Sequence, residues 1–149
     1  MRSTSGLPLL IGCCLTTIAA LLVVGVISHG VVRHLVQTSP LWIAVVLGAS
    51  RSTLTRWAAL PCLLFWLVLM VTVWLYLLGW VWFISGTFSP AEIALTVVVA
   101  AAAAVGLVQA VAMRSTGGRP SRALATIAVV GLLQVLAFRL SLTPQIAHR

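Results

Sequence analysis

The feature that most constrains this chain is a set of long apolar segments that contain almost no charge. Four such segments cover residues 7–28, 57–84, 90–113 and 123–142. A helix needs about 20 consecutive, mostly apolar residues to cross the hydrocarbon core of a bilayer, and each segment is long enough. The sequence therefore predicts an all-α integral membrane protein with four transmembrane helices, in which residues 1–149 form a single polytopic membrane domain with no soluble domain.

A shorter apolar segment lies between the first two. Residues 41–49 are apolar, but Pro40 comes directly before them, and Gln37, Thr38 and Ser39 precede the proline. Because this run is too short to cross a bilayer by itself, we expect residues 35–50 to form a fifth, short or re-entrant piece that lies along or dips into the membrane. A weak fifth crossing is the open alternative.

The composition also indicates a lipid environment. Hydrophobic residues make up 62% of the chain and charged residues 7%, with a mean hydropathy of +1.19, whereas about a quarter of the residues are charged in a soluble globular domain. The basic residues are all Arg, and the single acid is Glu92. The arginines lie at segment ends and form no basic stripe interleaved with aromatics. The net charge of +8 therefore indicates orientation in a membrane and no nucleic-acid partner.

The arginines also predict the orientation of the chain, because cytoplasmic loops carry an excess of basic residues. With four crossings or with five, the more basic side holds the same five arginines: Arg51, Arg56, Arg114, Arg119 and Arg122. We expect them on the cytoplasmic face and the C-terminus on the other side, whereas the side of the N-terminus differs between the two topologies. The lack of Lys, with much Ala, Val, Leu and Gly, is typical of a GC-rich coding sequence and indicates a bacterial inner membrane.

Glu92 is the only acidic side chain that could carry chemistry. It stands in the sequence Ser89-Pro90-Ala91-Glu92, which is typical of a helix start: a serine N-cap, a proline in the first turn, and a glutamate that can reach back to the cap. We therefore predict that Glu92 caps the 90–113 helix. The alternative is a role in transport, because a carboxylate inside a membrane can couple proton movement to transport.

The 90–113 segment also carries a stripe of small residues. Ala102, Gly106 and Ala110 lie close to one i, i+4 line with Ala94, and Val98 is its one larger member. Small residues let the backbone of a neighbouring helix approach closely. We expect this helix at the centre of the bundle or at an interface with a second copy or another membrane subunit.

Two glutamines, Gln109 and Gln134, are further candidates for a functional or packing role. Gln134 lies nearest the expected bilayer centre, where a side-chain amide needs an interhelical hydrogen-bond partner. We interpret it as a packing contact, with a place in a transport path as the alternative.

The sequence predicts no cofactor, metal site or catalytic centre. His29 and His34 do not align on one helical face, so a haem site is not expected. Cys13, Cys14 and Cys62 have no metal-ligand spacing and fall in apolar segments, where we expect buried structural thiols. With no Asp and a single Glu, the chain has no carboxylate pair, and we predict that it is not an enzyme.

These features favour a small non-enzymatic integral membrane protein that works in the lipid bilayer as an accessory or assembly subunit or as a self-associating bundle. The alternative is a small transporter or channel for hydrophobic or anionic solutes. In size and hydropathy the chain resembles the small multidrug exporters, which carry their key glutamate deep within the first helix. Residues 7–28 contain no acid, so the resemblance covers architecture and no motif.

Overall fold

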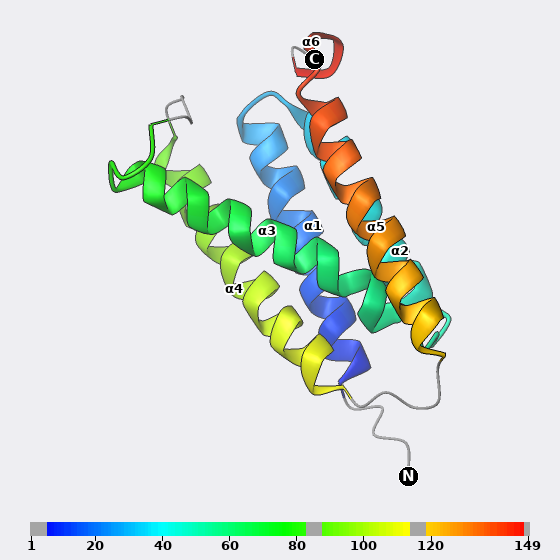
Figure 1. Cartoon of the computed structure of the whole chain (residues 1–149). Coiled ribbons are helices and arrows are strands. Elements are labelled where there is room, and N and C mark those ends of the chain that lie inside the picture. Colours follow the sequence, from blue (N-terminus) through cyan, green and yellow to red (C-terminus); the bar gives the residue numbers. More distant parts are fainter. Residues whose placement is uncertain (1–5, 83–87, 114–118, 148–149) are drawn as a thin grey trace.

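The part of the chain that the structure describes is all-helical. The computed structural model describes residues 6–82, 88–113 and 119–147. These residues form five long helices and one short C-terminal turn of helix (Figure 1): α1 Leu7–Ile27, α2 Val31–Ala49, α3 Thr55–Leu77, α4 Pro90–Ala112, α5 Pro120–Ser141 and α6 Pro144–Ala147. All five long helices are long and apolar enough to cross a membrane, which indicates a multi-pass membrane protein.

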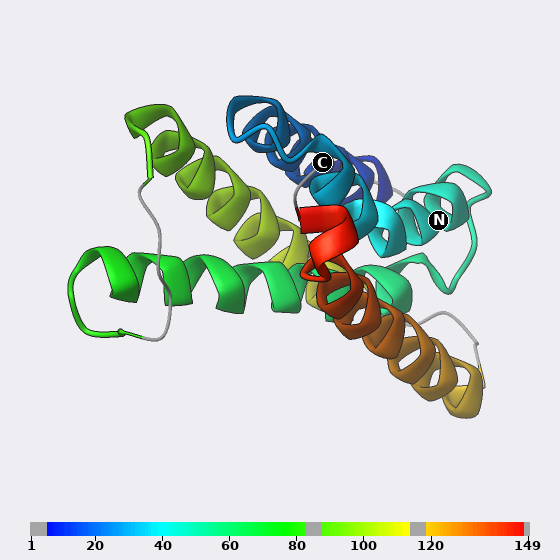
Figure 2. The ribbon, with the colours of Figure 1, turned by 90° about the horizontal axis from the view of Figure 1, so that it is seen from above.

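The five long helices run alternately up and down (Figure 1). Helix α3 crosses the bundle obliquely and contacts each of the other four, so it is the central element. Helix α4 packs on α1 and α3, and α5 packs on α2 and α3. Seen from above, α4 and α5 therefore lie on opposite sides of the bundle (Figure 2).

The core lies where α1, α2, α3 and α4 meet, and α5 contributes little to it. Trp66 of α3 is its largest fully buried side chain, at 1% exposed. Most of its other members are aliphatic or small: Leu10, Cys14, Ile18 and Leu21 of α1, Leu41 and Ala44 of α2, Ala58, Ala59, Cys62, Leu63 and Met70 of α3, Val99, Ala103 and Ala110 of α4, and Val130 of α5.

Helix α2 differs from the expected short piece at 35–50, because Val31–Ala49 is a helix of 19 residues. The expectation of four spans and a short fifth segment is therefore met only in part. Pro40 lacks the N–H that would donate to the carbonyl of Val36, and the Ser39 hydroxyl donates to this carbonyl instead at 2.8 Å. Thr38 likewise donates to the carbonyl of His34 at 2.9 Å. The polar residues of α2 thus satisfy backbone groups inside their own helix.

Helix α3 ends earlier than the predicted segment 57–84, at Leu77. Gly79 follows with a φ of +78°, in the left-handed region that glycine adopts without strain. Its N–H donates to the carbonyl of Tyr76 at 2.9 Å, and the N–H of Trp80 donates to that of Leu75 at 2.9 Å. This pair of bonds is a Schellman motif, which closes the helix although the sequence remains apolar.

Two other helices end with the same motif but without glycine at the left-handed position. His29 follows α1 with a φ of 57°, and Arg51 follows α2 with a φ of 52°. The N–H of the next residue donates to the carbonyl five positions earlier, at 2.8 Å after α1 and 2.9 Å after α2. The remaining predicted boundaries agree with the structure within three residues. The largest difference is at the start of α5, which begins at Pro120 instead of residue 123.

Candidate functional site

Helices α2 and α5 share a cluster of polar side chains, which we call the α2–α5 polar cluster: Gln37, Gln134 and Ser141. All three side chains are buried. The Nε2 of Gln37 donates to the Oγ of Ser141 at 2.9 Å, and the Nε2 of Gln134 donates to the backbone carbonyl of Gln37 at 3.1 Å. The Ser141 hydroxyl in turn donates to the carbonyl of Phe138 at 2.6 Å. This cluster joins α2, the most polar of the five long helices, to α5.

Helical periodicity places these side chains together. Gln134 and Ser141 are two turns apart and therefore lie on one face of α5, which packs on α2. Gln134 has an interhelical partner as predicted, and it is the backbone carbonyl of Gln37, three residues before the proline of α2. Gln37 and Ser141 were not predicted as members of a site. The spacing of Ser141 from Gln134 is the signal that indicates a shared face.

Three buried polar atoms in the described residues make no hydrogen bond: the Oε1 of Gln134, the Nε of Arg33 and the Nε1 of Trp66. Arg33 lies one helical turn before Gln37, so it shares the face of α2 that carries the cluster. An amide oxygen is an acceptor, and a guanidinium is a donor only. The Gln134 oxygen can therefore only accept a hydrogen bond, and the Arg33 nitrogen can only donate one.

Glu92 lies in the helix cap predicted from the sequence. Its Oε2 accepts hydrogen bonds from the backbone N–H of Ser89 at 2.7 Å and from the Ser89 hydroxyl at 2.8 Å. The N–H of Glu92 donates back to the Oγ of Ser89 at 3.3 Å. Both halves of a capping box are therefore present at the start of α4, where the helix dipole also favours a negative charge.

The small-residue stripe of α4 is covered within the chain. Ala102, Gly106 and Ala110 are buried, and α4 packs on α1 and α3. A Cβ added at Gly106 would lie 2.9 Å from the Cβ of Cys13 and 2.8 Å from the Cδ1 of Leu63, so only glycine permits this approach. Ala94 and Val98, at the other end of the stripe, are exposed.

Gln109 lies at the end of α4 over the start of α1. A Cβ added at Gly6 would fall 1.9 Å from the Nε2 of Gln109. The glutamine side chain therefore covers the first turn of α1, and its end would have to shift if residue 6 carried a Cβ. Gln109 and Gln134 are thus far apart in the fold and do not belong to one site, because they lie on α4 and α5 at opposite sides of the bundle (Figure 2).

One end of the bundle carries most of the described arginines, and we call it the arginine-rich end: Arg51, Arg56, Arg119 and Arg122. Helices α2 and α4 end here, and α1, α3 and α5 begin here (Figure 1). Arg33 near the start of α2 and Arg139 near the end of α5 lie at the opposite end. The predicted cytoplasmic arginines therefore share one end of the structure, apart from Arg114, which lies outside the described residues.

Arg56 joins α3 to α4 at this end. Its Nη1 donates to the backbone carbonyl of Met113, the residue that caps the C-terminus of α4. The guanidinium also stacks over the ring of Trp57, with its Cζ 3.9 Å from the ring centroid. A cation at a helix C-terminus is favourable because the exposed carbonyls there carry partial negative charge. Arg56 therefore has a structural role, because it joins α3 to the end of α4.

Cys13, Cys14 and Cys62 are buried free thiols, at most 7% exposed. His29 is exposed in the turn after α1, and the Nδ1 of His34 lies 3.0 Å from the carbonyl of Gly30. Among the described residues, no group of three or more His, Cys, Asp or Glu side chains could hold a metal ion.

Comparison of the chain with protein-family models, with curated proteins and with solved structures finds no match.

Proposed function

We propose that this chain is a non-enzymatic integral membrane protein of a bacterial inner membrane, acting as an accessory or assembly subunit or as a self-associating bundle. The observation that carries this proposal is that polar side chains of the helices make hydrogen bonds within the chain itself. Glu92 caps α4, and the α2–α5 polar cluster joins two helices of the same chain. These groups stabilise the bundle and do not converge on a reaction centre.

The partner surface in this proposal is the outward face of α4. Because Ala102, Gly106 and Ala110 already contact the chain itself, a second copy or another membrane subunit would pack on the opposite side of the helix. That side is exposed and built from small and β-branched residues, which suit close packing of helices in lipid. We call these residues the outward face of α4: Ala94, Val97, Val98, Ala101, Val105, Val108 and Val111.

The distribution of charge supports an orientation. The arginine-rich end faces the cytoplasm in this proposal, because basic residues are retained on that side. Five crossings then place the start of α1 on the cytoplasmic side and the end of α5 on the other side. The lack of Lys supports a GC-rich bacterial source.

The test is the composition of the complex purified in mild detergent. We expect a stable homo-oligomer or a defined complex with another membrane subunit. Ala101→Trp on the outward face of α4 should dissociate it, because a large side chain there prevents close approach without disturbing the core. Ala128→Trp, at an exposed position of α5, is the matched control and should leave the complex intact. A wild-type chain that is monomeric and free of other subunits would overturn the proposal.

A transporter or channel for hydrophobic or anionic solutes is the second candidate. It is favoured by one observation, namely that the Oε1 of Gln134 and the Nε of Arg33 are buried without partners next to the α2–α5 polar cluster. Polar groups inside a membrane mark solute pathways when they are not fully paired. Arg33 would attract an anion, and Gln134 would accept a hydrogen bond from a solute farther inside.

Transport in vesicles separates the two candidates. If the leading proposal is right, vesicles that contain the purified chain should not take up hydrophobic or anionic solutes when a protonmotive force is applied. Uptake that Glu92→Gln abolishes would replace that proposal with a proton-coupled transporter. Uptake that Gln134→Leu abolishes, while Glu92→Gln leaves it intact, would instead indicate a path along α2 and α5.

A further inference from the structure

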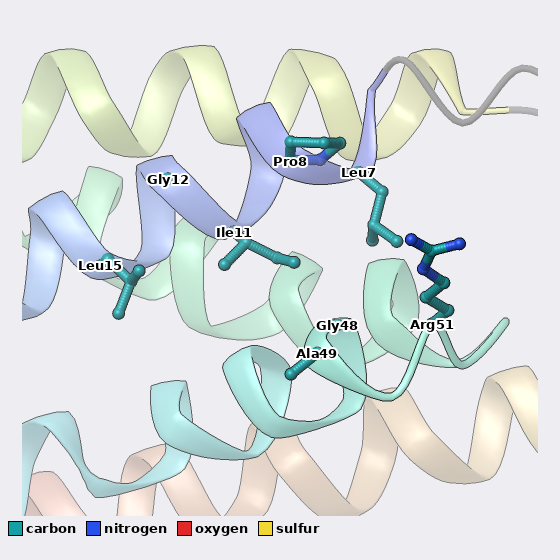
Figure 3. A pocket seen from close by; sticks show the side chains of 8 residues that line it. All are labelled: Leu7, Pro8, Ile11, Gly12, Leu15, Gly48, Ala49 and Arg51. Atoms are coloured by element: carbon teal, nitrogen blue, oxygen red, sulfur yellow. The ribbon is translucent and has the colours of Figure 1, made fainter.

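A groove opens on the surface of the bundle at the arginine-rich end, between the first turns of α1 and the last turn of α2 (Figure 3). It is shallow and open to the outside, with a volume of about 400 Å³. Its walls are apolar, with Leu7, Ile11 and Leu15 on the α1 side and Ala49 on the α2 side. Since α1 and α2 are membrane-spanning helices, this groove faces the acyl chains of the bilayer.

Two glycines, Gly12 of α1 and Gly48 of α2, line the groove. A Cβ added at Gly12 meets no atom within 4 Å, so the space beside this residue is open. Gly48 on the facing helix is buried under Ile11, whose Cγ1 lies 2.6 Å from the position that a Cβ would take. The two helices thus pack closely at Gly48 and leave a hollow at Gly12.

Arg51 closes one end of this apolar groove (Figure 3). It occupies the left-handed position after α2, with a φ of 52°, and its side chain extends toward Leu7. Arg51 is exposed, and the only acidic side chain of the chain, Glu92, lies at the other end of the bundle, at the start of α4. The positive charge at the mouth of the groove therefore has no carboxylate side chain of its own chain to pair with.

An apolar trough that ends in an unpaired arginine is complementary to an amphiphilic anion. The start of α1 lies at the same end, and the dipole of that helix adds partial positive charge. We propose that the groove is a binding site for one anionic phospholipid: an acyl chain lies along Ile11, Gly12 and Leu15, and the phosphate accepts hydrogen bonds from Arg51. A lipid phosphate is bound at the depth where arginine side chains meet the headgroups.

Native mass spectrometry of the purified chain, titrated with phosphatidylglycerol and with phosphatidylcholine of the same acyl chains, tests this proposal. We expect one phosphatidylglycerol to bind more tightly than phosphatidylcholine. Arg51→Asn removes the charge but suits the left-handed backbone, and it should weaken phosphatidylglycerol binding about tenfold, as expected for the loss of a hydrogen bond to a charged group. Arg51→Lys should retain the preference for the anionic lipid. Glycerol phosphate should not compete, because it lacks the acyl chain.

One further variant tests the apolar part of the site. Gly12→Leu places a side chain where an added Cβ meets no atom within 4 Å, so it should occupy the groove and weaken binding of phosphatidylglycerol while the chain stays folded. Arg122→Gln and Ala128→Leu, at exposed positions of α5 away from the groove, are the matched controls and should bind like the wild type. The proposal is wrong if Arg122→Gln weakens binding as much as Arg51→Asn does, if Gly12→Leu has no effect, or if the two lipids bind equally.

Discussion

At the scale of single residues, the ends of three helices depend on one position each in the left-handed backbone region. Gly79 adopts this conformation without strain, whereas His29 and Arg51 do so with a side chain attached. A non-glycine residue in this region costs about 1–2 kcal/mol. The end of α3 could not be predicted from hydropathy, because residues 57–84 are almost entirely apolar and a hydropathy pattern does not show that a glycine ends the helix.

Replacing His29 by glycine should raise the free energy of unfolding by about 1 kcal/mol, because it removes the strain at a φ of 57°. Gly79→Ala should lower it by a similar amount, and the cause is the backbone alone because no atom lies within 4 Å of the added Cβ. Denaturant unfolding in detergent micelles measures both. Changes of the same sign in the two variants would contradict this account.

Two substitutions of Glu92 should show whether its contribution to stability comes from the helix cap or from its charge. Glu92→Gln should change the free energy of unfolding by less than about 0.5 kcal/mol, because glutamine also completes a capping box. Glu92→Ala should lower it by about 1 kcal/mol, since the N–H and hydroxyl of Ser89 lose their acceptor. The same unfolding measurement applies. Equal losses in both variants would show that the charge and not the cap is required.

At the scale of helices, most of this fold could be predicted from the sequence. The apolar segments gave α1, α4 and α5 closely, because hydropathy reports what a lipid environment requires of a helix. The length of α2 was underestimated, because a hydropathy pattern counts every polar side chain against a membrane-spanning helix. Thr38 and Ser39 bond to the backbone of their own helix, and Gln37 bonds to α5. The partner of Gln37 is far away in the sequence, so no local pattern predicts it.

The contact between α2 and α5 should contribute a measurable coupling energy. In a double-mutant cycle, Gln37→Leu and Ser141→Ala each remove one side of the 2.9 Å hydrogen bond. We expect an interaction energy of about 0.6–1.7 kcal/mol, the range found for interhelical hydrogen bonds in membranes. Thr126→Val, on α5 but bonded to its own helix at Arg122, is the control and should be additive with Gln37→Leu. Additivity of the first pair would mean that the bond contributes nothing to stability.

At the scale of the whole molecule, the charges divide between the two ends of the bundle. Four of the described arginines gather where α2 and α4 end, while Glu92 lies at the other end with Arg33 and Arg139. The sequence predicted the grouping of Arg51, Arg56, Arg119 and Arg122. The apolar segments show which loops lie at the same end of the bundle, and the arginines lie in or beside those loops. It did not predict the groove at this end, which depends on how Ile11 of α1 packs over Gly48 of α2 while the space beside Gly12 stays open.

Labelling of single cysteines tests the orientation and the fifth crossing together. Ser28 and Thr53 are exposed at opposite ends of α2, and the native cysteines are buried, so the parent chain should take up little label. In intact spheroplasts, a membrane-impermeant maleimide should label Ser28→Cys, and Thr53→Cys should react only after permeabilisation. Protection of both positions would mean that α2 does not cross the membrane. The reverse pattern would place the arginine-rich end outside, against the rule that basic loops stay in the cytoplasm.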